Sequence, residues 1–417
     1  MEQLQCPISP DPWGSRTVLA RIQGRPVPSP GPEAELWAGA HPSAPATVAG
    51  VPLTERIAAD PSGMLGQRVV ERFGPRLPFL LKVLAAEQPL SLQAHPDPAQ
   101  AAAGYAAEEA AGVPLTAPHR RYVDPYAKPE LLVAVSRFRA LCGFREPTVS
   151  AELLADLGVP ALAPVVAALR DRDLAAAVAA VLPGPEGLVG EVAAAAAGRG
   201  GPYRVVADLA GSYPDDPGVV AALLLNQVTL APGEAIFMPA GNLHVYLGGA
   251  AVEIMAASDN VLRGGLTSKH VDVAELRRVL RFEPLADPVL APVPVAAGVV
   301  TWPVPVGDFA LYRATVGGRV PRVELAPPGP TVALCLSGEV AVDDGDRTAG
   351  GVRLRAGEAA FGRYRGRALS VTGEGEVYLA TVGEPARSVP RFFQISAESL
   401  DTAIASGNDG VTQRYRD

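Results

Sequence analysis

The residues best suited to chemistry are a glutamine and a histidine two positions apart, in the segment Ser91-Leu-Gln-Ala-His-Pro-Asp97. Residues two apart in a strand point to the same face of a sheet. Gln93 and His95 can therefore present a carbonyl oxygen and an imidazole nitrogen to one metal ion. The alternative is a polar strand end in which a backbone partner satisfies His95, and for this segment alone that alternative is preferred.

A second histidine, His244, closes the pattern G-x5-P-x-G-x2-H. This pattern resembles the second motif of cupin barrels, in which the glycines and proline turn the chain at the barrel mouth and the histidine points inward to a metal. The closing asparagine of that motif is replaced by Gly248, and the His-x-His of the first cupin motif is present only as Gln-x-His. The sequence therefore predicts a cupin-like metal site with an altered donor set.

Lysine is rare in this chain, because only three of the 36 basic residues are lysine: Lys82, Lys128 and Lys269. Lysine supplies a compact charge that can lose its proton, and arginine does not. The three positions are candidate sites of chemistry, unless they are simply what a biased composition leaves behind. Lys128 precedes Glu130 in a Lys-Pro-Glu turn, and Lys269 ends a patch that also carries two carboxylates and an arginine.

Together these motifs resemble those of the type I phosphomannose isomerases. The resemblance rests on Gln-Ala-His-Pro-Asp, Lys-Pro-Glu before a strand, Pro-Gly-Glu-Ala followed by His-x-Tyr, and Ala-Ser-Asp-Asn-Val-Leu-Arg-x-Gly-Leu-Thr-x-Lys. It implies an enzyme, a metal-dependent aldose–ketose isomerase of carbohydrate metabolism. The implied reaction interconverts mannose 6-phosphate and fructose 6-phosphate through a cis-enediol.

The resemblance also implies the zinc ligands and the residues that line the pocket, and the chemistry of each side chain suggests its individual role. One Zn²⁺ per chain is expected as a Lewis acid, held by Gln93, His95, Glu130 and His244. The expected catalytic residues are Arg263, which stabilises the enediolate, Lys128 as the preferred proton carrier, and Asp259 or Glu253 as relay or ring-opening acid. The expected substrate-binding residues are Lys82, Ser91, Tyr246 and Lys269, with Lys82 and Ser91 preferred for the phosphate and Lys269 as its alternative partner.

Two other functions are compatible with the same residues. His95, Glu130 and His244 also supply the two histidines and one carboxylate of an Fe(II) oxygenase, although Gln93 would close a face that an oxygenase keeps open. A non-catalytic sugar-binding bicupin is the second alternative, and the lysines around the predicted site argue against it.

The elements that must position these residues are mainly strands. The pattern predicts a mainly β protein with a helical insert: two cupin-like jelly-roll β-barrels plus an α-helical domain. The catalytic barrel is expected in two parts, 1–147 and 217–285, around a helical insert at 148–216. A C-terminal jelly roll without a metal site is expected at 286–417. Strands and turns are expected before residue 145, strands again from about residue 216, and short helices at 97–111 and 272–279.

A short repeated motif, called the internal echo below, suggests that the two barrels are related. Leu230-Ala-Pro-Gly-Glu-Ala is followed much later by Leu354-Arg-Ala-Gly-Glu-Ala, each time between strand-like runs. All five histidines lie at or before residue 270, so the second barrel is expected to lack a histidine metal site.

The amino-acid composition limits which binding partners and which cellular compartment are expected. The 417 residues carry 36 basic and 44 acidic side chains, which argues against a nucleic-acid binder. Neither a membrane span nor a secretory signal is expected, and three scattered cysteines favour a reducing compartment. We therefore expect a cytoplasmic enzyme that acts on a small sugar phosphate and has no obligate protein partner.

Overall fold

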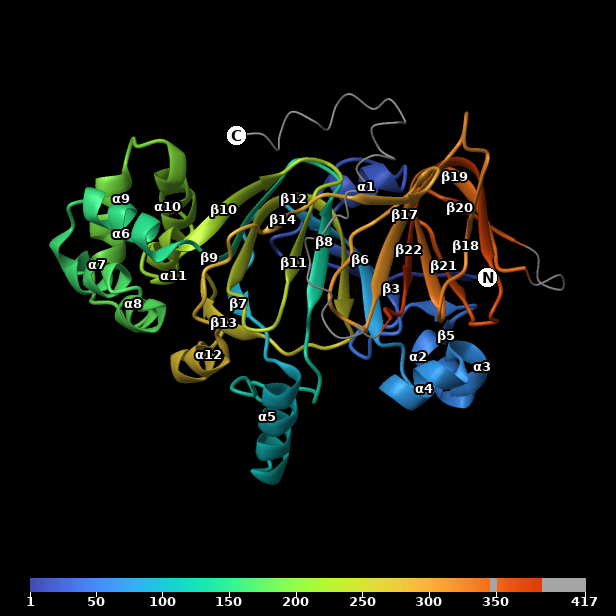
Figure 1. Ribbon diagram of the computed structural model, residues 1–417, viewed down its shortest axis with the longest axis horizontal. Coiled ribbons are helices and arrows are strands. Elements are labelled where there is room, and N and C mark those ends of the chain that lie inside the picture. The colour runs from blue at the N-terminus through green and yellow to red at the C-terminus, as the bar shows by residue number, and fades with distance from the viewer. Residues whose placement is uncertain (346–350, 385–417) are drawn as a thin grey trace, which may run out of the picture. The chain divides into compact units, whose positions relative to one another are not determined.

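Two large antiparallel sheets dominate the computed structural model, which describes residues 1–345 and 351–384 (Figure 1). The first sheet has 11 strands: β2 (Ile8–Ser9), β3 (Glu35–Gly39), β6 (Phe79–Ala86), β7 (Leu92–Ala94), β8 (Glu130–Ala134), β9 (Phe138–Phe144), β10 (Leu225–Leu230), β11 (Ala235–Met238), β12 (His244–Ala256), β13 (Leu262–Gly265) and β14 (Val289–Leu290). The second has nine: β1 (Glu2–Leu4), β15 (Val293–Ala296), β16 (Val299–Thr301), β17 (Ala310–Val316), β18 (Arg322–Leu325), β19 (Thr331–Asp343), β20 (Val352–Arg355), β21 (Ala359–Gly362) and β22 (Leu369–Thr381). A small sheet pairs β4 (Thr47–Val48) with β5 (Val51–Pro52). The predicted β-rich class with a helical region is confirmed.

The second sheet carries the C-terminal part of the described chain. The jelly roll predicted at 286–417 also includes residues 346–350 and 385–417, which lie outside the described residues.

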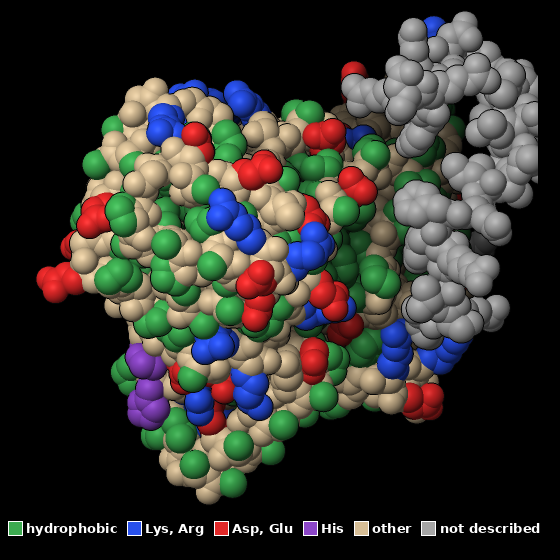
Figure 2. Space-filling view, turned by 60° about the vertical axis from the view of Figure 1, so that its left-hand side comes forward, with side chains coloured by type: hydrophobic (Ala, Val, Ile, Leu, Met, Phe, Trp, Pro, Cys, Tyr) green, Lys and Arg blue, Asp and Glu red, His purple; other side chains and the backbone are tan. Residues whose placement is uncertain are grey.

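Basic and acidic side chains are interspersed on the face shown in Figure 2. No helix in the described part of the chain is long and apolar enough to cross a membrane.

Strand β12 is the element that joins the two halves of the first sheet. Its first residues pair with β7 and β9, whereas its later residues pair with β6 and β8. The register shifts between Tyr246 and Gly248, and Gly249 has a φ of 126°. A Cβ atom at Gly249 would lie 2.7 Å from the carbonyl oxygen of Arg137. Glycine is therefore required where this strand bends from one set of partners to the other.

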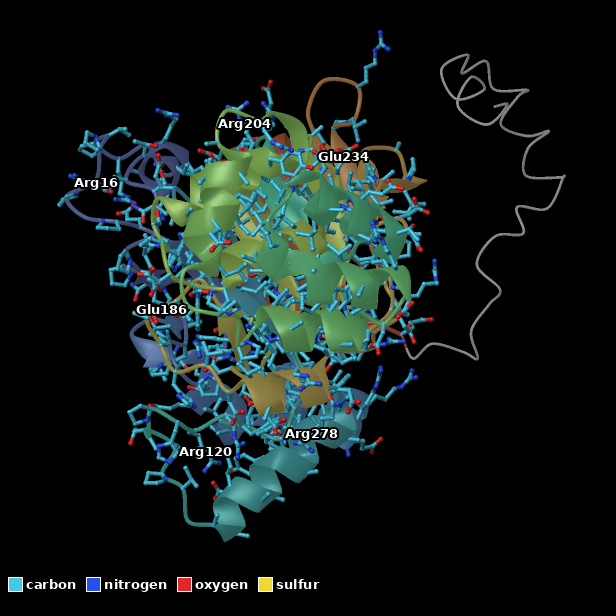
Figure 3. All side chains as sticks on the ribbon, turned by 90° about the vertical axis from the view of Figure 1, so that its left-hand side faces the viewer. Arg16, Arg120, Glu186, Arg204, Glu234 and Arg278 are labelled. Atoms are coloured by element: carbon cyan, nitrogen blue, oxygen red, sulfur yellow. The ribbon has the colours of Figure 1, made fainter. Side chains whose placement is uncertain are left out.

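Two helices predicted beside the site are confirmed: α5 (Pro98–Ala110) and α12 (Val273–Val279). Asp97 caps α5 in a capping box with Gln100, and Asp272 caps α12. The connection after α5 is tied to α12 by a bond from the Tyr122 hydroxyl to Glu275, to which Arg278 also donates. Figure 3 labels Arg278 on α12 and Arg120 on the connection that follows α5.

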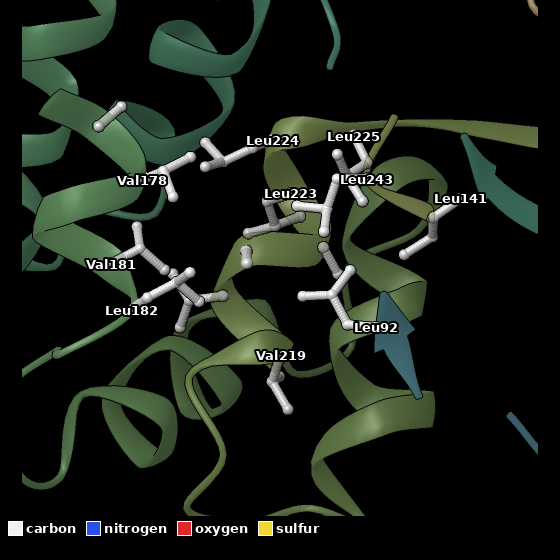
Figure 4. Close-up of a cluster of buried hydrophobic side chains, with 14 of the residues drawn as sticks. Leu92, Leu141, Val178, Val181, Leu182, Val219, Leu223, Leu224, Leu225 and Leu243 are labelled. Carbon is white, nitrogen blue, oxygen red and sulfur yellow. The ribbon is translucent and has the colours of Figure 1, made fainter. Parts of the chain in front are cut away.

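The helical insert follows β9 and precedes β10, as expected. It comprises α6 (Pro147–Asp156), η1 (Pro160–Leu162), α7 (Ala163–Arg170), α8 (Leu174–Val181), α9 (Leu188–Ala196), η2 (Gly201–Tyr203), α10 (Arg204–Ala210), α11 (Gly218–Ala221) and η3 (Ala222–Leu224). Its apolar side chains form one buried cluster with residues of the first sheet (Figure 4). That cluster includes Leu92 of β7 and Leu243, the neighbours of Gln93 and His244. The insert thus supports the strands that carry the predicted ligands.

Two segments differ from the predictions. Four short helices lie where strands and turns were expected: α1 (Val18–Ile22), α2 (Leu53–Ala59), α3 (Pro61–Leu65) and α4 (Gln67–Phe73). They have only five to seven residues each, too few to display a helical period in the sequence. Residues 218–224 are helical rather than extended, and an entirely apolar run does not distinguish the two states.

The internal echo corresponds to the same turn in both sheets. Gly233 and Gly357 have φ values of 91° and 82°. In each turn the glutamate side chain accepts a bond from the backbone N–H three residues earlier, at 2.8 Å: Glu234 from Ala231 and Glu358 from Arg355. The two repeats therefore share a strand–turn–strand conformation, held by the same side-chain bond.

Candidate metal centre

Three buried side chains from different parts of the first sheet converge at one point. His95 follows β7, Glu130 begins β8 and His244 begins β12. One ligand atom from each lies within 4.8 Å of the other two. The register explains the convergence, because β11 pairs Met238 with Glu130, the short connection 239–243 leads from Met238 to His244, and β12 pairs His244 with Gln93.

Both histidine rings are oriented by backbone carbonyl groups. His95 Nδ1 lies 2.8 Å from the carbonyl oxygen of Asn260, and His244 Nδ1 lies 3.0 Å from that of Asn242. A carbonyl oxygen only accepts, so each Nδ1 carries the proton and each Nε2 presents a lone pair. Each Nε2 is 3.4 Å from Glu130 Oε2. Such outer bonds are typical of metal-ligating histidines.

The donor atoms are in the charge states that a divalent cation requires. Burial lowers the pKa of His95 to about 4, so its ring is neutral at pH 7. Burial opposes the ionisation of Glu130, but the charge of Lys128 holds the pKa of this carboxyl well below its usual range. His95 Nε2 and Glu130 Oε2 are buried without a hydrogen-bond partner among the described residues. Because unpartnered buried polar atoms are costly, the residues fit a bound cation.

Gln93 and Lys128 complete the surroundings of this cluster. The Gln93 amide Nε2 lies 3.3 Å from His244 Nε2, and a half-turn of the amide presents Oε1 at the same place. The Lys128 amine is buried and lies 3.1 Å from Glu130 Oε1, the carboxylate oxygen that faces away from the histidines. All four predicted ligands and one predicted catalytic lysine are therefore brought together.

A second buried network surrounds Lys82. Its amine contacts Glu253 at 2.5 Å and Glu35 at 3.1 Å, and the Tyr246 hydroxyl donates to Glu253 at 2.8 Å. Burial alone would lower the pKa of Lys82, but the two carboxylates raise it above its usual range. Burial and Glu253 raise the pKa of Tyr246 well above its usual range, so this hydroxyl stays protonated. The charge of Lys82 is thus compensated within the protein.

The remaining predicted residues are more accessible. Arg263 pairs with Gln93 across β13 and β7 and is half-buried, and burial lowers the pKa of its guanidinium. Its side chain has no hydrogen bond or ion pair with any described residue. Ser91 is half-buried before β7, Asp259 is half-exposed, and Lys269 is exposed after β13. These four side chains line or flank the strands that carry the cluster.

Asn260 is a residue of the site that was not predicted. Its backbone carbonyl holds His95, while its side-chain oxygen accepts from the N–H of Val123 at 2.8 Å. Its side-chain nitrogen donates to the carbonyl oxygens of Asp124 and Tyr126, at 2.7 and 2.8 Å. Asn260 thereby joins the segment before Lys128 to the loop before β13. Its place in the Ser-Asp-Asn patch was the only signal in the sequence.

We expect Asn260→Ala to weaken binding of a divalent metal ion by about 10- to 100-fold, because outer-shell partners orient the ligands. Isothermal titration of the metal-free protein measures this change directly. Gln227→Ala is the control, since the exposed Gln227 amide also donates to a backbone carbonyl, that of Pro202 in the helical insert. Equal metal affinity in the Asn260 variant and the wild type would contradict the assignment.

A cavity of about 510 Å³ adjoins this region. It is lined by side chains from several loops, including His41, Ser43, Arg76, Tyr126 and Asp259. Its size is typical of sites for small organic molecules. Tyr126 lies two residues before Lys128, and Asp259 lies beside Asn260. The cavity therefore borders the segments that carry the metal cluster.

Comparisons with known proteins agree with this geometry. Residues 1–147 match the family model "Phosphomannose isomerase type I, catalytic domain". The chain is 37% identical over 380 residues to the mannose-6-phosphate isomerase of Escherichia coli strain K12, covering 88% of this chain and 95% of that protein. It is 31% identical to the Bos taurus enzyme, over 81% of this chain and 87% of that one. A crystal structure of zinc-bound mannose 6-phosphate isomerase superimposes with a TM-score of 0.83 at 35% identity, covering 92% of this chain and 99% of the other.

Proposed function

The chain belongs to the type I phosphomannose isomerase family, and from that premise we propose how its residues perform the reaction. The reaction interconverts mannose 6-phosphate and fructose 6-phosphate, and the cofactor is zinc. The observation that carries this conclusion is the buried cluster of His95, Glu130 and His244, with two donor atoms left unpartnered. Family membership sets aside the alternatives of an Fe(II) oxygenase and of a non-catalytic sugar-binding protein.

We propose that His95, Glu130 and His244 hold the zinc ion, with Gln93 as the fourth ligand. Bound there, zinc supplies a Lewis acid that polarises oxygen atoms of the sugar. Two neutral nitrogens, one neutral oxygen and one carboxylate leave the site with a net positive charge. A positive site favours the negative charge that develops on the enediolate.

The proton that moves between C1 and C2 is assigned to Lys128. Its amine is buried beside Glu130 Oε1, within the same site as the ligands. Lys128 in its amine form takes the proton from C2 of mannose 6-phosphate and returns it to C1. Glu130 Oε1 keeps the Lys128 side chain oriented toward the site during both transfers.

Arg263 is assigned to the enediolate oxygens. Its guanidinium stays charged, has no protein partner among the described residues, and lies across from Gln93. An unpaired cation beside the ligand strand is free to pair with charge that appears only during the reaction. Glu253 and Asp259 remain predicted relay or ring-opening acids, and Tyr246 supports Glu253 through its hydroxyl.

Two sets of residues are candidates for binding the 6-phosphate of the substrate. Lys82 and Ser91 were preferred from the sequence, but the two carboxylates around Lys82 argue against a further anion there. Lys269 is exposed, and no acidic side chain in the described chain forms an ion pair with it. Lys269 is therefore the better supported partner of the 6-phosphate.

The organisation and the cellular setting are also proposals. We propose a catalytic barrel built from 1–147 and 217–285, a helical insert at 148–216, and a C-terminal barrel at 286–417 without a metal site. We also propose that the enzyme acts in the cytoplasm, without nucleic acid or an obligate protein partner. The three cysteines are free, and Cys142 and Cys335 are buried, which supports a reducing compartment.

Removal of the metal tests the function. Wild-type protein stripped with a chelator is expected to lose formation of fructose 6-phosphate from mannose 6-phosphate, and added Zn²⁺ is expected to restore it. A coupled assay follows the product, and elemental analysis follows the metal. Full activity in protein shown to be free of metal would contradict the role of zinc, and no activity with any divalent metal would contradict the reaction.

A further inference from the structure

Two polar side chains, His41 and Asp259, lie on the wall of the 510 Å³ cavity, and the mechanism above gives no role to His41. His41 follows β3 and Asp259 precedes β13, and both line the cavity. His41 is only 2% exposed, and its Nε2 has no hydrogen-bond partner among the described residues. Burying an unpartnered donor is costly, so this atom points to an absent partner.

The protonation of His41 follows from its neighbours. Its Nδ1 accepts a bond from the backbone N–H of Ser43 at 3.3 Å, so the proton of the neutral ring lies on Nε2. Burial lowers the pKa of His41, which favours this neutral form. The ring packs edge-on against Trp37, with centroids 5.0 Å apart, which holds its orientation. His41 thus presents one fixed N–H donor.

Asp259 presents the complementary group. Its Oδ1 lies 3.6 Å from His41 Nε2, too far for a direct hydrogen bond. Its other oxygen, Oδ2, accepts from the Ser43 hydroxyl, and this bond orients the carboxylate. One oxygen atom placed in the cavity can lie within hydrogen-bonding distance of both His41 Nε2 and Asp259 Oδ1, because the two are only 3.6 Å apart.

We propose that His41 and Asp259 together bind one hydroxyl group of the sugar, a subsite that rests on the proposed function. The N–H of His41 donates to the hydroxyl oxygen, and Oδ1 of Asp259 accepts the hydroxyl proton. No proton is transferred in this contact, which leaves the relay or ring-opening role to Glu253. A hydroxyl is the group that both donates and accepts, whereas a phosphate would be repelled by Asp259 and a metal ion would find no lone pair on Nε2.

The bound hydroxyl is one on C3 or C4. The oxygens of C1 and C2 take part in the reaction at the metal, while those of C3 and C4 are unchanged between aldose and ketose. A contact to an unchanged hydroxyl stabilises substrate, transition state and product alike. Its loss therefore raises KM more than it lowers kcat.

The test combines substitutions at His41 with deoxy analogues of the substrate. His41→Asn keeps an acceptor for the Ser43 N–H but removes the Nε2 donor, and we expect kcat/KM to fall by about 10- to 100-fold, mainly through KM. His41→Gln places an amide N–H near the lost position and is expected to recover part of that loss. His119→Asn is the matched control, because His119 is exposed.

The deoxy analogues separate a binding role from a structural one. For the wild type, kcat/KM is expected to fall by a similar factor with one of the two analogues, 3-deoxy- or 4-deoxymannose 6-phosphate. For His41→Asn, kcat/KM with that analogue is expected to fall no further than it has already fallen with mannose 6-phosphate. If, for both analogues, the loss of kcat/KM from His41→Asn adds to the loss from the missing hydroxyl, the subsite is overturned and His41 is a purely structural residue. Inactivity of the wild type itself toward mannose 6-phosphate would instead refute the proposed function.

Discussion

His244→Ala is expected to lower kcat/KM for mannose 6-phosphate by about 1,000-fold or more, because it removes a proposed ligand of the zinc ion. His244 is fully buried, and its Nε2 is directed at Glu130 Oε2 by the bond of Nδ1 to the Asn242 carbonyl. An alanine leaves a gap where one of the two nitrogen donors stood. The remaining donors would hold Zn²⁺ more weakly and without a fixed geometry.

The measurement pairs kinetics with metal content. Steady-state assays at saturating Zn²⁺ give kcat/KM, and elemental analysis after dialysis gives the bound metal. His119→Ala is the control, because it removes an exposed imidazole that does not belong to the cluster. A His244 variant that retains one zinc ion per chain and wild-type kinetics would contradict the ligand assignment. Circular dichroism and thermal melting show whether the variant is folded.

Arg263→Ala is expected to lower kcat by about 100- to 1,000-fold, with a smaller change in KM. The reason is the role proposed for the guanidinium, which would pair with charge present on the enediolate and not on the bound substrate. Because Arg263 has no partner among the described residues, its removal leaves no protein carboxylate uncompensated. Loss of activity would therefore reflect the reaction and not a broken ion pair.

A conservative variant and a matched control sharpen this test. Arg263→Lys is expected to recover only part of kcat, since an ammonium group cannot form two parallel bonds to adjacent oxygens. Arg277→Ala, on an exposed position of α12, is expected to keep wild-type kinetics. Zinc content is expected to stay at the wild-type level in all three variants. An Arg263→Ala enzyme with unchanged kcat would remove Arg263 from the mechanism.

The metal donors were predictable because their motifs are local. Gln93 and His95 lie two residues apart on a strand, and the turn before His244 is set by glycine and proline over a few residues. The capped helices α5 and α12 were predicted for the same reason, since each cap acts within one turn. The short helices α1 to α4 were not, because five to seven residues leave no period to detect.

The sequence by itself determined which residue types are available for chemistry and in what order they occur. It predicted the donor set of the metal site, and it shows that lysine is rare and occurs only at positions 82, 128 and 269. The family resemblance added the reaction. These properties depend on residue identity and on contacts between near neighbours in the chain, which a single sequence displays.

Only the tertiary structure decided what each polar group faces. The register of β6 with β12 sets Lys82 opposite Glu253, which makes this lysine part of a buried ion-pair network. The packing of loops far apart in the chain places the Asn260 carbonyl on His95 and brings His41 to Asp259. The physical reason is that strand register and loop packing arise from many long-range contacts at once, and no local spacing encodes them.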